Sequence, residues 1–113
     1  MKKSIAMKWI KILRNGEFKQ IKGALENESG NCCLGVLCNM ALIEGICDFT
    51  RINVETINAF DNAWVTLPCS VMKWAEIKTT DASFNFESLA DINDQGKSFS
   101  QIADIIEKHW RKL

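Results

Sequence analysis

Three of the five cysteines fall within seven residues, in the segment CCLGVLC at positions 32–38. The segment follows the turn-forming residues Ser29-Gly30-Asn31 and opens an apolar pattern of helical spacing. Thiols in this setting suit metal ligation, nucleophilic catalysis, or burial as small apolar groups in a core. The choice among these three interpretations decides whether we expect an enzyme.

The spacing of the cysteines disfavours a zinc site. Structural zinc sites pair Cys or His residues two to four positions apart, twice over. Here two cysteines are adjacent, the following intervals are five, nine and 22 residues, and the one histidine is His109. We therefore predict neither a metal nor another cofactor.

A thiol at the start of a helix is the second interpretation, because a helix N-terminus favours the thiolate. Cys33-Leu34-Gly35-Val36 after a turn is similar to the opening of papain-like peptidoglycan hydrolases. Such enzymes also need a histidine within reach of the thiol, and His109 near the C-terminus is the one candidate. A cysteine hydrolase using Cys32 or Cys33 with His109 is thus an alternative, and we assign no catalytic residue.

Burial accounts for the whole segment without a missing partner. At a strand-to-helix junction Cys32 and Cys33 would point to opposite faces, and Cys38 would lie one turn after Leu34. Gly35 would let the helix approach a neighbouring backbone closely. An odd number of cysteines without a secretory signal also predicts reduced thiols in the cytoplasm.

Two polar segments are candidate ligand-binding sites. Phe18, Gln20 and Lys22 alternate along an extended segment, where a ring can stack on a base while amide and ammonium groups hold a phosphate. Asn93 and Asp94 lie in a turn before a helix, a common place to bind ribose or an anion. The plainer alternatives are an amphipathic strand with Phe18 buried and ordinary turn chemistry.

The net charge of zero hides a strong asymmetry along the chain. Residues 1–22 carry seven Lys/Arg and one Glu, residues 23–107 carry four Lys/Arg and 13 acids, and residues 108–113 add three cations. The basic N-terminal segment either packs against an acidic body or attracts phosphate-bearing ligands. The acidic body disfavours specific nucleic-acid binding, and no apolar run approaches the roughly 20 residues that span a membrane.

The elements that position these residues predict one α+β domain over residues 1–113, with about three helices packed on a small antiparallel sheet or hairpin. Helical patterns cover residues 4–14 with Ser4 as N-cap, residues 34–43, a segment opened by Pro68, and a final helix capped by Ser98 and Gln101. The final helix carries a continuous apolar stripe formed by Phe99, Ile102, Ala103, Ile106 and Trp110.

Strand signals are weaker. Residues 17–25 read as extended, and the turn at 27–30 would return residues 31–33 beside them as a hairpin. Residues 64–66 suggest a short strand, and residues 77–86 a loop or weak hairpin. Strand and short helix both fit residues 46–63, where the pattern is carried by Ile46, Phe49, Ile52, Val54 and Ile57.

Taken together, the segments FKQIKGAL, CCLGVLCNMA, LPCSVMKWA and LADINDQGKSFSQIADIIE resemble a family of small proteins encoded by tailed bacteriophages. The chain departs from the family pattern at Glu76, where glycine is more typical, and His109 is not a family feature. The resemblance implies a phage protein made in the cytoplasm of the infected bacterium. It carries no shared activity, but small accessory phage proteins often block host defence, in some cases as oligomeric sponges for cyclic nucleotide signals.

We therefore expect a non-enzymatic accessory protein that counters host defence by sequestering a nucleotide-like signal. Phe18, Gln20 and Lys22 would supply stacking and donors, while Asn93 and Asp94 would contact ribose. A host defence protein is the alternative partner, a homo-oligomer is compatible with either, and a structural module of the virion is a third interpretation.

Overall fold

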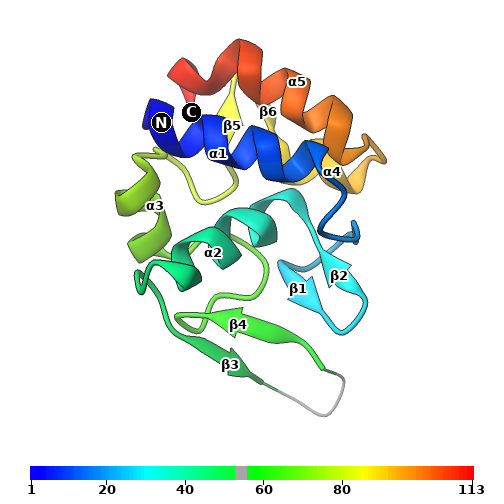
Figure 1. The fold of residues 1–113 in the computed structure, drawn as a ribbon, viewed down its shortest axis with the longest axis vertical. Helices are drawn as coiled ribbons and strands as arrows, with labels where there is room; N and C mark the ends of the chain where they lie inside the picture. Colours follow the sequence, from blue (N-terminus) through cyan, green and yellow to red (C-terminus); the bar gives the residue numbers. More distant parts are fainter. Residues whose placement is uncertain (53–55) are drawn as a thin grey trace.

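The computed structural model describes residues 1–52 and 56–113 and has α+β architecture, as predicted (Figure 1). Val54 lies outside the described residues. In the described ranges the α-helices are α1 (Lys3–Arg14), α2 (Cys33–Ile43), α3 (Cys69–Ala75), α4 (Leu89–Asp94) and α5 (Phe99–His109), followed by the 3₁₀ turn η1 (Trp110–Lys112). The strands are β1 (Glu26–Asn27), β2 (Gly30–Asn31), β3 (Phe49–Arg51), β4 (Asn58–Phe60), β5 (Ser83–Phe84) and β6 (Glu87–Ser88). The prediction of about three helices was therefore too low.

The elements form layers around α2. Helices α1 and α5 lie side by side at one end of the molecule, and the sheet of order β2-β1-β4-β3 lies at the other, with α2 between them (Figure 1). The strand neighbours in this sheet and in the separate β5–β6 hairpin pair antiparallel. The chain ends meet, because the Met1 amine donates to the Leu113 carbonyl at 3.2 Å.

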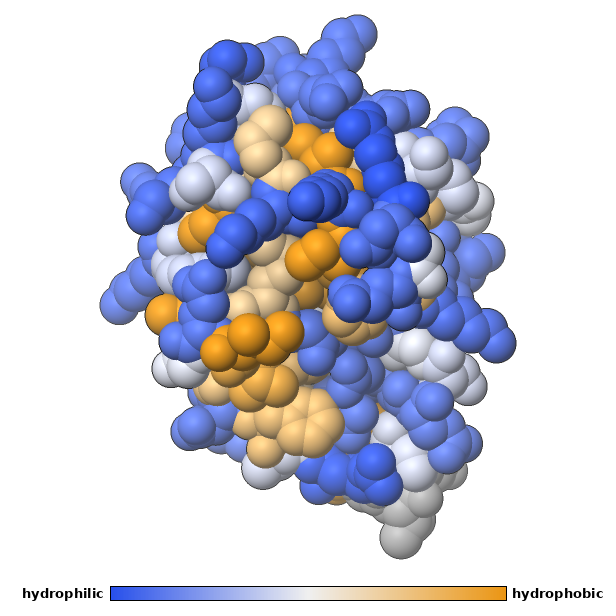
Figure 2. Space-filling model, in the orientation of Figure 1, coloured by the Kyte–Doolittle hydropathy of each residue, from blue (hydrophilic) through white to orange (hydrophobic). Residues whose placement is uncertain are grey.

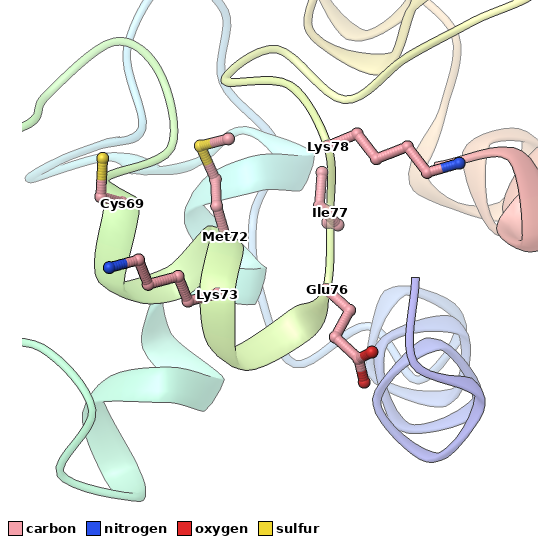
Figure 3. Close-up of a pocket in the computed structure, with 6 residues that line it drawn as sticks. All are labelled: Cys69, Met72, Lys73, Glu76, Ile77 and Lys78. Carbon is pink, nitrogen blue, oxygen red and sulfur yellow. The ribbon is translucent and has the colours of Figure 1, made fainter.

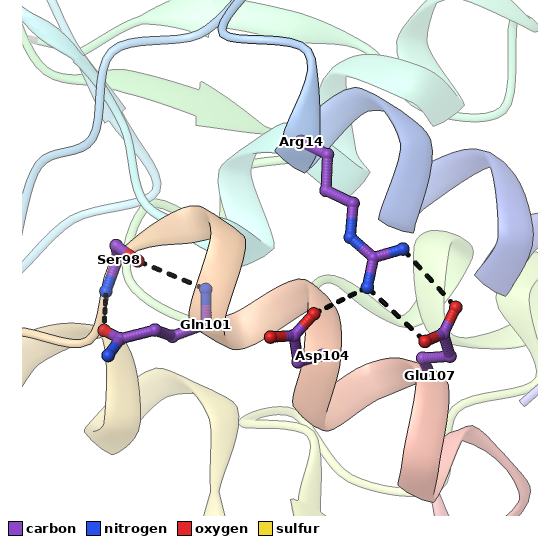
Figure 4. Close-up of polar contacts among 5 residues, drawn as sticks. All are labelled: Arg14, Ser98, Gln101, Asp104 and Glu107. Atoms are coloured by element: carbon purple, nitrogen blue, oxygen red, sulfur yellow. Dashed lines mark hydrogen bonds and ion pairs between the residues drawn. The ribbon is translucent and has the colours of Figure 1, made fainter.

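Helices α1 and α5 are held by apolar stripes and by one arginine. The buried side of α5 contains the predicted residues Phe99, Ile102, Ala103 and Ile106, while Trp110 is half-buried. Arg14 reaches from α1 to Asp104 at 2.6 Å and to Glu107 at 3.4 Å (Figure 4). The capping box predicted for Ser98 and Gln101 is confirmed (Figure 4).

Several predicted boundaries were wrong. Lys2, not Ser4, occupies the N-cap of α1, and Pro68 precedes α3 as its N-cap instead of opening the helix. Of the segment 17–25, only Gln20 makes a strand-type bridge, to Asn31, since pairing proper starts at β1. Helix α4 was missed because its six residues give too short an apolar pattern, although Ser88 caps it through the Asp91 amide.

Candidate functional site

The CCLGVLC segment is a buried junction between β2 and α2. Cys33 and Cys38 have no exposed surface, and Cys32 is 5% exposed. Cys32 caps α2, with its sulfur accepting from the Gly35 amide at 3.4 Å, and the Cys33 thiol donates to the Leu89 carbonyl at 3.5 Å. The prediction that these cysteines belong to the core is confirmed.

Gly35 sets how closely α2 can approach the rest of the chain. A Cβ atom added to Gly35 would lie 1.8 Å from the Leu25 carbonyl oxygen, far inside van der Waals contact. Gly30 is similar, because an added Cβ would lie 2.2 Å from the Lys19 carbonyl oxygen. The predicted close approach at Gly35 is thus confirmed, and Gly30 plays the same part in the preceding turn.

This environment works against a nucleophilic thiol in the segment. Burial raises the pKa of Cys32 to about 11 and holds the pKa values of Cys33 and Cys38 well above the ordinary value. His109, the other half of the predicted catalytic pair, stacks on Phe84 with ring centroids 4.9 Å apart. The thiols are therefore held in the protonated form that lacks nucleophilic reactivity.

The predicted ligand residues Gln20, Asn93 and Asp94 come together in a hydrogen-bonded group that we call the amide clasp. Gln20 Nε2 donates to Asn93 Oδ1 and to the Lys97 carbonyl, both at 2.8 Å. Asn93, fully buried, also accepts from the Cys33 amide at 3.1 Å and donates to the Ile21 carbonyl at 2.8 Å. The clasp joins three segments that are distant in sequence: residues 20–23, the start of α2 and the end of α4.

The clasp uses most of the polar groups that the sequence suggested for a ligand. Both amide protons of Gln20 are donated within the protein, and its oxygen accepts from the Phe99 amide at 3.1 Å. Phe18 is half-buried against the core, which leaves it little face for stacking. Lys22 and Asp94 remain exposed, so these two keep the capacity to contact a ligand.

An acidic cleft of about 260 Å³ opens beside the clasp. Asp94 lies on its wall and fixes the neighbouring loop, since Asp94 Oδ1 accepts from the Gly23 amide at 3.1 Å. The Lys22 ammonium lies near the Gly96 turn, 3.7 Å from where a Cβ of Gly96 would be. The remaining lining combines carboxylates with small or apolar groups: Ala24, Cys32, Val65, Thr66, Asp81, Ala90 and Asp91. The cleft therefore suits a ligand that presents several hydrogen-bond donors.

A second polar group, missed by the sequence analysis, surrounds Glu26. Its carboxylate accepts from the side-chain amides of Asn31 at 2.9 Å, Asn39 at 3.0 Å and Asn58 at 2.6 Å. These amides come from β2, α2 and β4, so Glu26 ties the sheet to the central helix. Because Glu26 and its partners are scattered along the chain, no local pattern could have revealed the group.

A depression of about 430 Å³ lies along α3 and contains the exposed thiol of Cys69 (Figure 3). Met72 and Ile77 supply apolar lining, while Lys73, Glu76 and Lys78 point in different directions away from one another. The Cys69 thiol thus has no base aimed at it within this view, and we assign no chemistry to the depression.

The β5–β6 hairpin ends in an unusual tip formed by Asn85 and Phe86. Both residues have positive φ, 46° and 67°, a combination that favours Asn-Gly and is strained for phenylalanine. Phe86 is also fully exposed. The fold thus holds an aromatic ring in solvent at a position where glycine would be more stable.

Comparison with known proteins gives one family. The sequence matches the model of a domain of unknown function, DUF8296, over residues 1–110. No curated protein and no solved structure matches the chain. Within the described part of the chain, no helix has both the length and the apolar character to cross a membrane, and no cluster of at least three His, Cys, Asp or Glu side chains is arranged to hold a metal ion.

Proposed function

Since the chain belongs to the DUF8296 family, whose function is unknown, we propose from its own geometry that it is a non-enzymatic binding protein. In this proposal it is a phage accessory protein in the cytoplasm of the infected bacterium, where it sequesters a nucleotide-like signal of host defence. The observation that carries the proposal is the acidic cleft, together with the exposed Lys22, which directly precedes the lining residue Gly23 in the sequence.

The negative charge of the cleft decides which part of a nucleotide enters it and which part stays outside. The carboxylates of Asp81, Asp91 and Asp94 accept hydrogen bonds from ribose hydroxyls or from the N–H groups of a base such as guanine. The same carboxylates repel phosphate, which therefore stays outside and contacts Lys22. Gln20 and Asn93 act indirectly, by holding the loop and helix that form the wall.

Isothermal titration calorimetry against a panel of cyclic di- and trinucleotides tests this proposal. We expect one or more members to bind, and expect Asp94→Asn and Lys22→Ala each to weaken binding by at least about tenfold. Lys73→Ala is the matched control, because Lys73 is an exposed lysine that lines the separate depression on α3. Absence of binding to every nucleotide, or equal loss in the control, would overturn the nucleotide proposal.

Binding to a host protein is the second candidate function, and the hairpin tip favours it. Exposed aromatic residues that enter a pocket are common energetic centres of protein interfaces. Affinity capture from infected-cell lysate with the wild-type chain and with Phe86→Ser tests this candidate. It predicts a host protein that the wild type retains and the variant loses, whereas identical captured sets would contradict it.

A further inference from the structure

A groove between three helices exposes apolar side chains that the fold leaves uncovered. The α1–α2–α3 groove has a volume of about 330 Å³, and its apolar floor contains Ile12, Met40 and Trp74. Ile43 stands at its edge with 85% of its surface exposed. Its remaining lining is polar: Lys8, Lys11, Asn15 and Glu44.

The exposure of Ile43 is at odds with the character of its helix. Helix α2 is apolar on nearly every face, which is typical of a helix enclosed on all sides. Its first turns are fully buried, but its last turn emerges at the groove with Ile43 in solvent. Figure 2 shows hydrophobic side chains gathering on this face along α2 and continuing towards β3, whose Phe49 is 42% exposed. The apolar C-terminal end of α2 would therefore be buried only if another molecule bound to this face.

The charges around the groove indicate what covers it. Lys8 and Lys11 lie on the α1 wall, whereas Glu44 follows α2 on the opposite side. Glu44 contacts Lys8 at 3.6 Å and accepts from the Trp74 ring nitrogen at 3.2 Å, while Lys11 has no ion pair with the described residues. A surface with cations on one wall and an anion on the other complements itself after a two-fold rotation.

We propose that this face binds a second copy of the chain, as a two-fold symmetric dimer. Ile43 of each copy enters the groove of the other, and Lys11 of each copy pairs with Glu44 of the other. A standard interface buries about 800 Å² on each partner, and the hydrophobic surface that Figure 2 shows on this face is available to extend the contact beyond the groove itself. This inference concerns a different surface from the acidic cleft and does not depend on nucleotide binding.

Sedimentation velocity of the full chain over a wide concentration range tests the dimer. We expect the mass to rise from 12.8 kDa to twice that value with increasing concentration. Ile43→Asp is expected to remain monomeric, with an unchanged circular dichroism spectrum and melting temperature because the side chain is mostly in solvent. Phe86→Ser, which removes an exposed apolar side chain at the hairpin tip, is the matched control and is expected to dimerise like the wild type.

A charge exchange tests the two-fold arrangement itself. Lys11→Glu and Glu44→Lys each place like charges opposite one another and are expected to weaken self-association by at least about tenfold. An equimolar mixture of the two variants restores both ion pairs, so it is expected to form the heterodimer.

Three results would overturn the proposal. These are a wild type that stays monomeric at every concentration, an Ile43→Asp variant that still dimerises, and a mixture of the charge variants that does not associate. A monomeric wild type that instead binds an added acidic amphipathic peptide at Ile43 would assign the groove to a different protein partner.

Discussion

The amide clasp and the α1–α2–α3 groove differ in how far their side chains find partners within the protein. In the clasp, residues that the sequence suggested for ligand binding form their hydrogen bonds inside the protein: Asn93 alone bonds to Gln20 and Ile21 in one distant segment and to Cys33 in another. In the groove, an apolar helix that should be covered ends with Ile43 in solvent. Polar residues thus stabilise the fold in one region, while apolar residues remain free for contacts in the other.

The difference teaches where function is best sought in a small domain. A dense cysteine motif such as CCLGVLC suggests a reactive or metal-binding site, yet here its residues pack in the core and cap a helix. Groups that the fold leaves unsatisfied carry more information, because they have a free-energy cost that folding alone does not explain. Ile43 and Phe86, which the fold leaves in solvent, belong to this second kind.

Alkylation of the thiols is expected to show the largest contrast. Cys69 is exposed, whereas Cys32, Cys33 and Cys38 are buried with raised pKa values. Iodoacetamide at neutral pH should modify Cys69 at least about a thousandfold faster than the buried thiols, which need unfolding for access. Mass spectrometry of the wild type and of Cys69→Ser measures this contrast. Rapid modification of Cys32 or Cys33 would instead favour the alternative interpretation of the chain as a cysteine hydrolase.

Gly35→Ala is expected to be the most destabilising substitution in the buried junction. The new Cβ would overlap the Leu25 carbonyl oxygen, so α2 must move away from the chain it packs against. We expect a loss of about 4 kcal/mol or more in the free energy of unfolding, measured by urea denaturation. Gly45→Ala is a useful contrast because an added Cβ there meets no atom within 4 Å, and only its positive φ of 75° opposes the change.

Asn93→Ala tests whether the clasp is structural. The substitution leaves the buried Cys33 amide and the Ile21 carbonyl without their partner, so we expect a loss of about 3 kcal/mol in the same measurement. Asp91→Ala, at an exposed cleft residue two positions earlier on α4, is the control and should have little effect on stability. A stable Asn93→Ala protein would contradict the structural role and return Asn93 to the candidate ligand residues.

Phe86→Gly is expected to stabilise the protein by about 0.5–1 kcal/mol. Glycine adopts the positive φ of this position without strain, and the fully exposed ring gives up no packing. Thermal denaturation measures the gain, with Phe86→Ser as the control that removes the ring but keeps a Cβ. A destabilised glycine variant would show that the ring makes contacts important to the fold.

Asp61→Asn is expected to have the smallest effect on stability, one that is present at neutral pH and disappears in acid. Its carboxylate accepts from the Asp48 amide at 2.7 Å and from the Ser70 hydroxyl, and these bonds lower the pKa of Asp61 below its ordinary value. A lowered folded-state pKa adds stability above the unfolded pKa of about 3.9 that is lost as pH falls through the folded value. Asp61→Asn, which tolerates the φ of 48°, should cost less than about 1 kcal/mol at neutral pH, and nothing at the acid end of a pH series of urea denaturations. A cost independent of pH would contradict this explanation.

Local signals predicted some elements well and others poorly. The capping box of α5, its apolar stripe and the turn between β1 and β2 were predicted, because each depends on residues a few positions apart. Helix α4 and strands β3 and β4 are too short to produce a clear hydrophobic period. Because β3 and β4 both lie within residues 46–63, the sequence pattern of that segment was ambiguous. The same limit applies to the site: the sequence singled out Gln20, Asn93 and Asp94 as ligand-binding candidates, but it could not show the partners with which they form hydrogen bonds, because these are distant in sequence.

The sequence alone determined the α+β class, the buried character of Cys32, Cys33 and Cys38, and the need for a glycine at position 35. These follow from side-chain size, polarity and short-range spacing, which the chain carries in any conformation. Only the tertiary structure decided that Gln20 and Asn93 bind each other, that Glu26 gathers three asparagines, and that Ile43 is left in solvent. The physical reason is that hydrogen-bond satisfaction and burial depend on which distant segments meet, and that is settled only when the chain has packed.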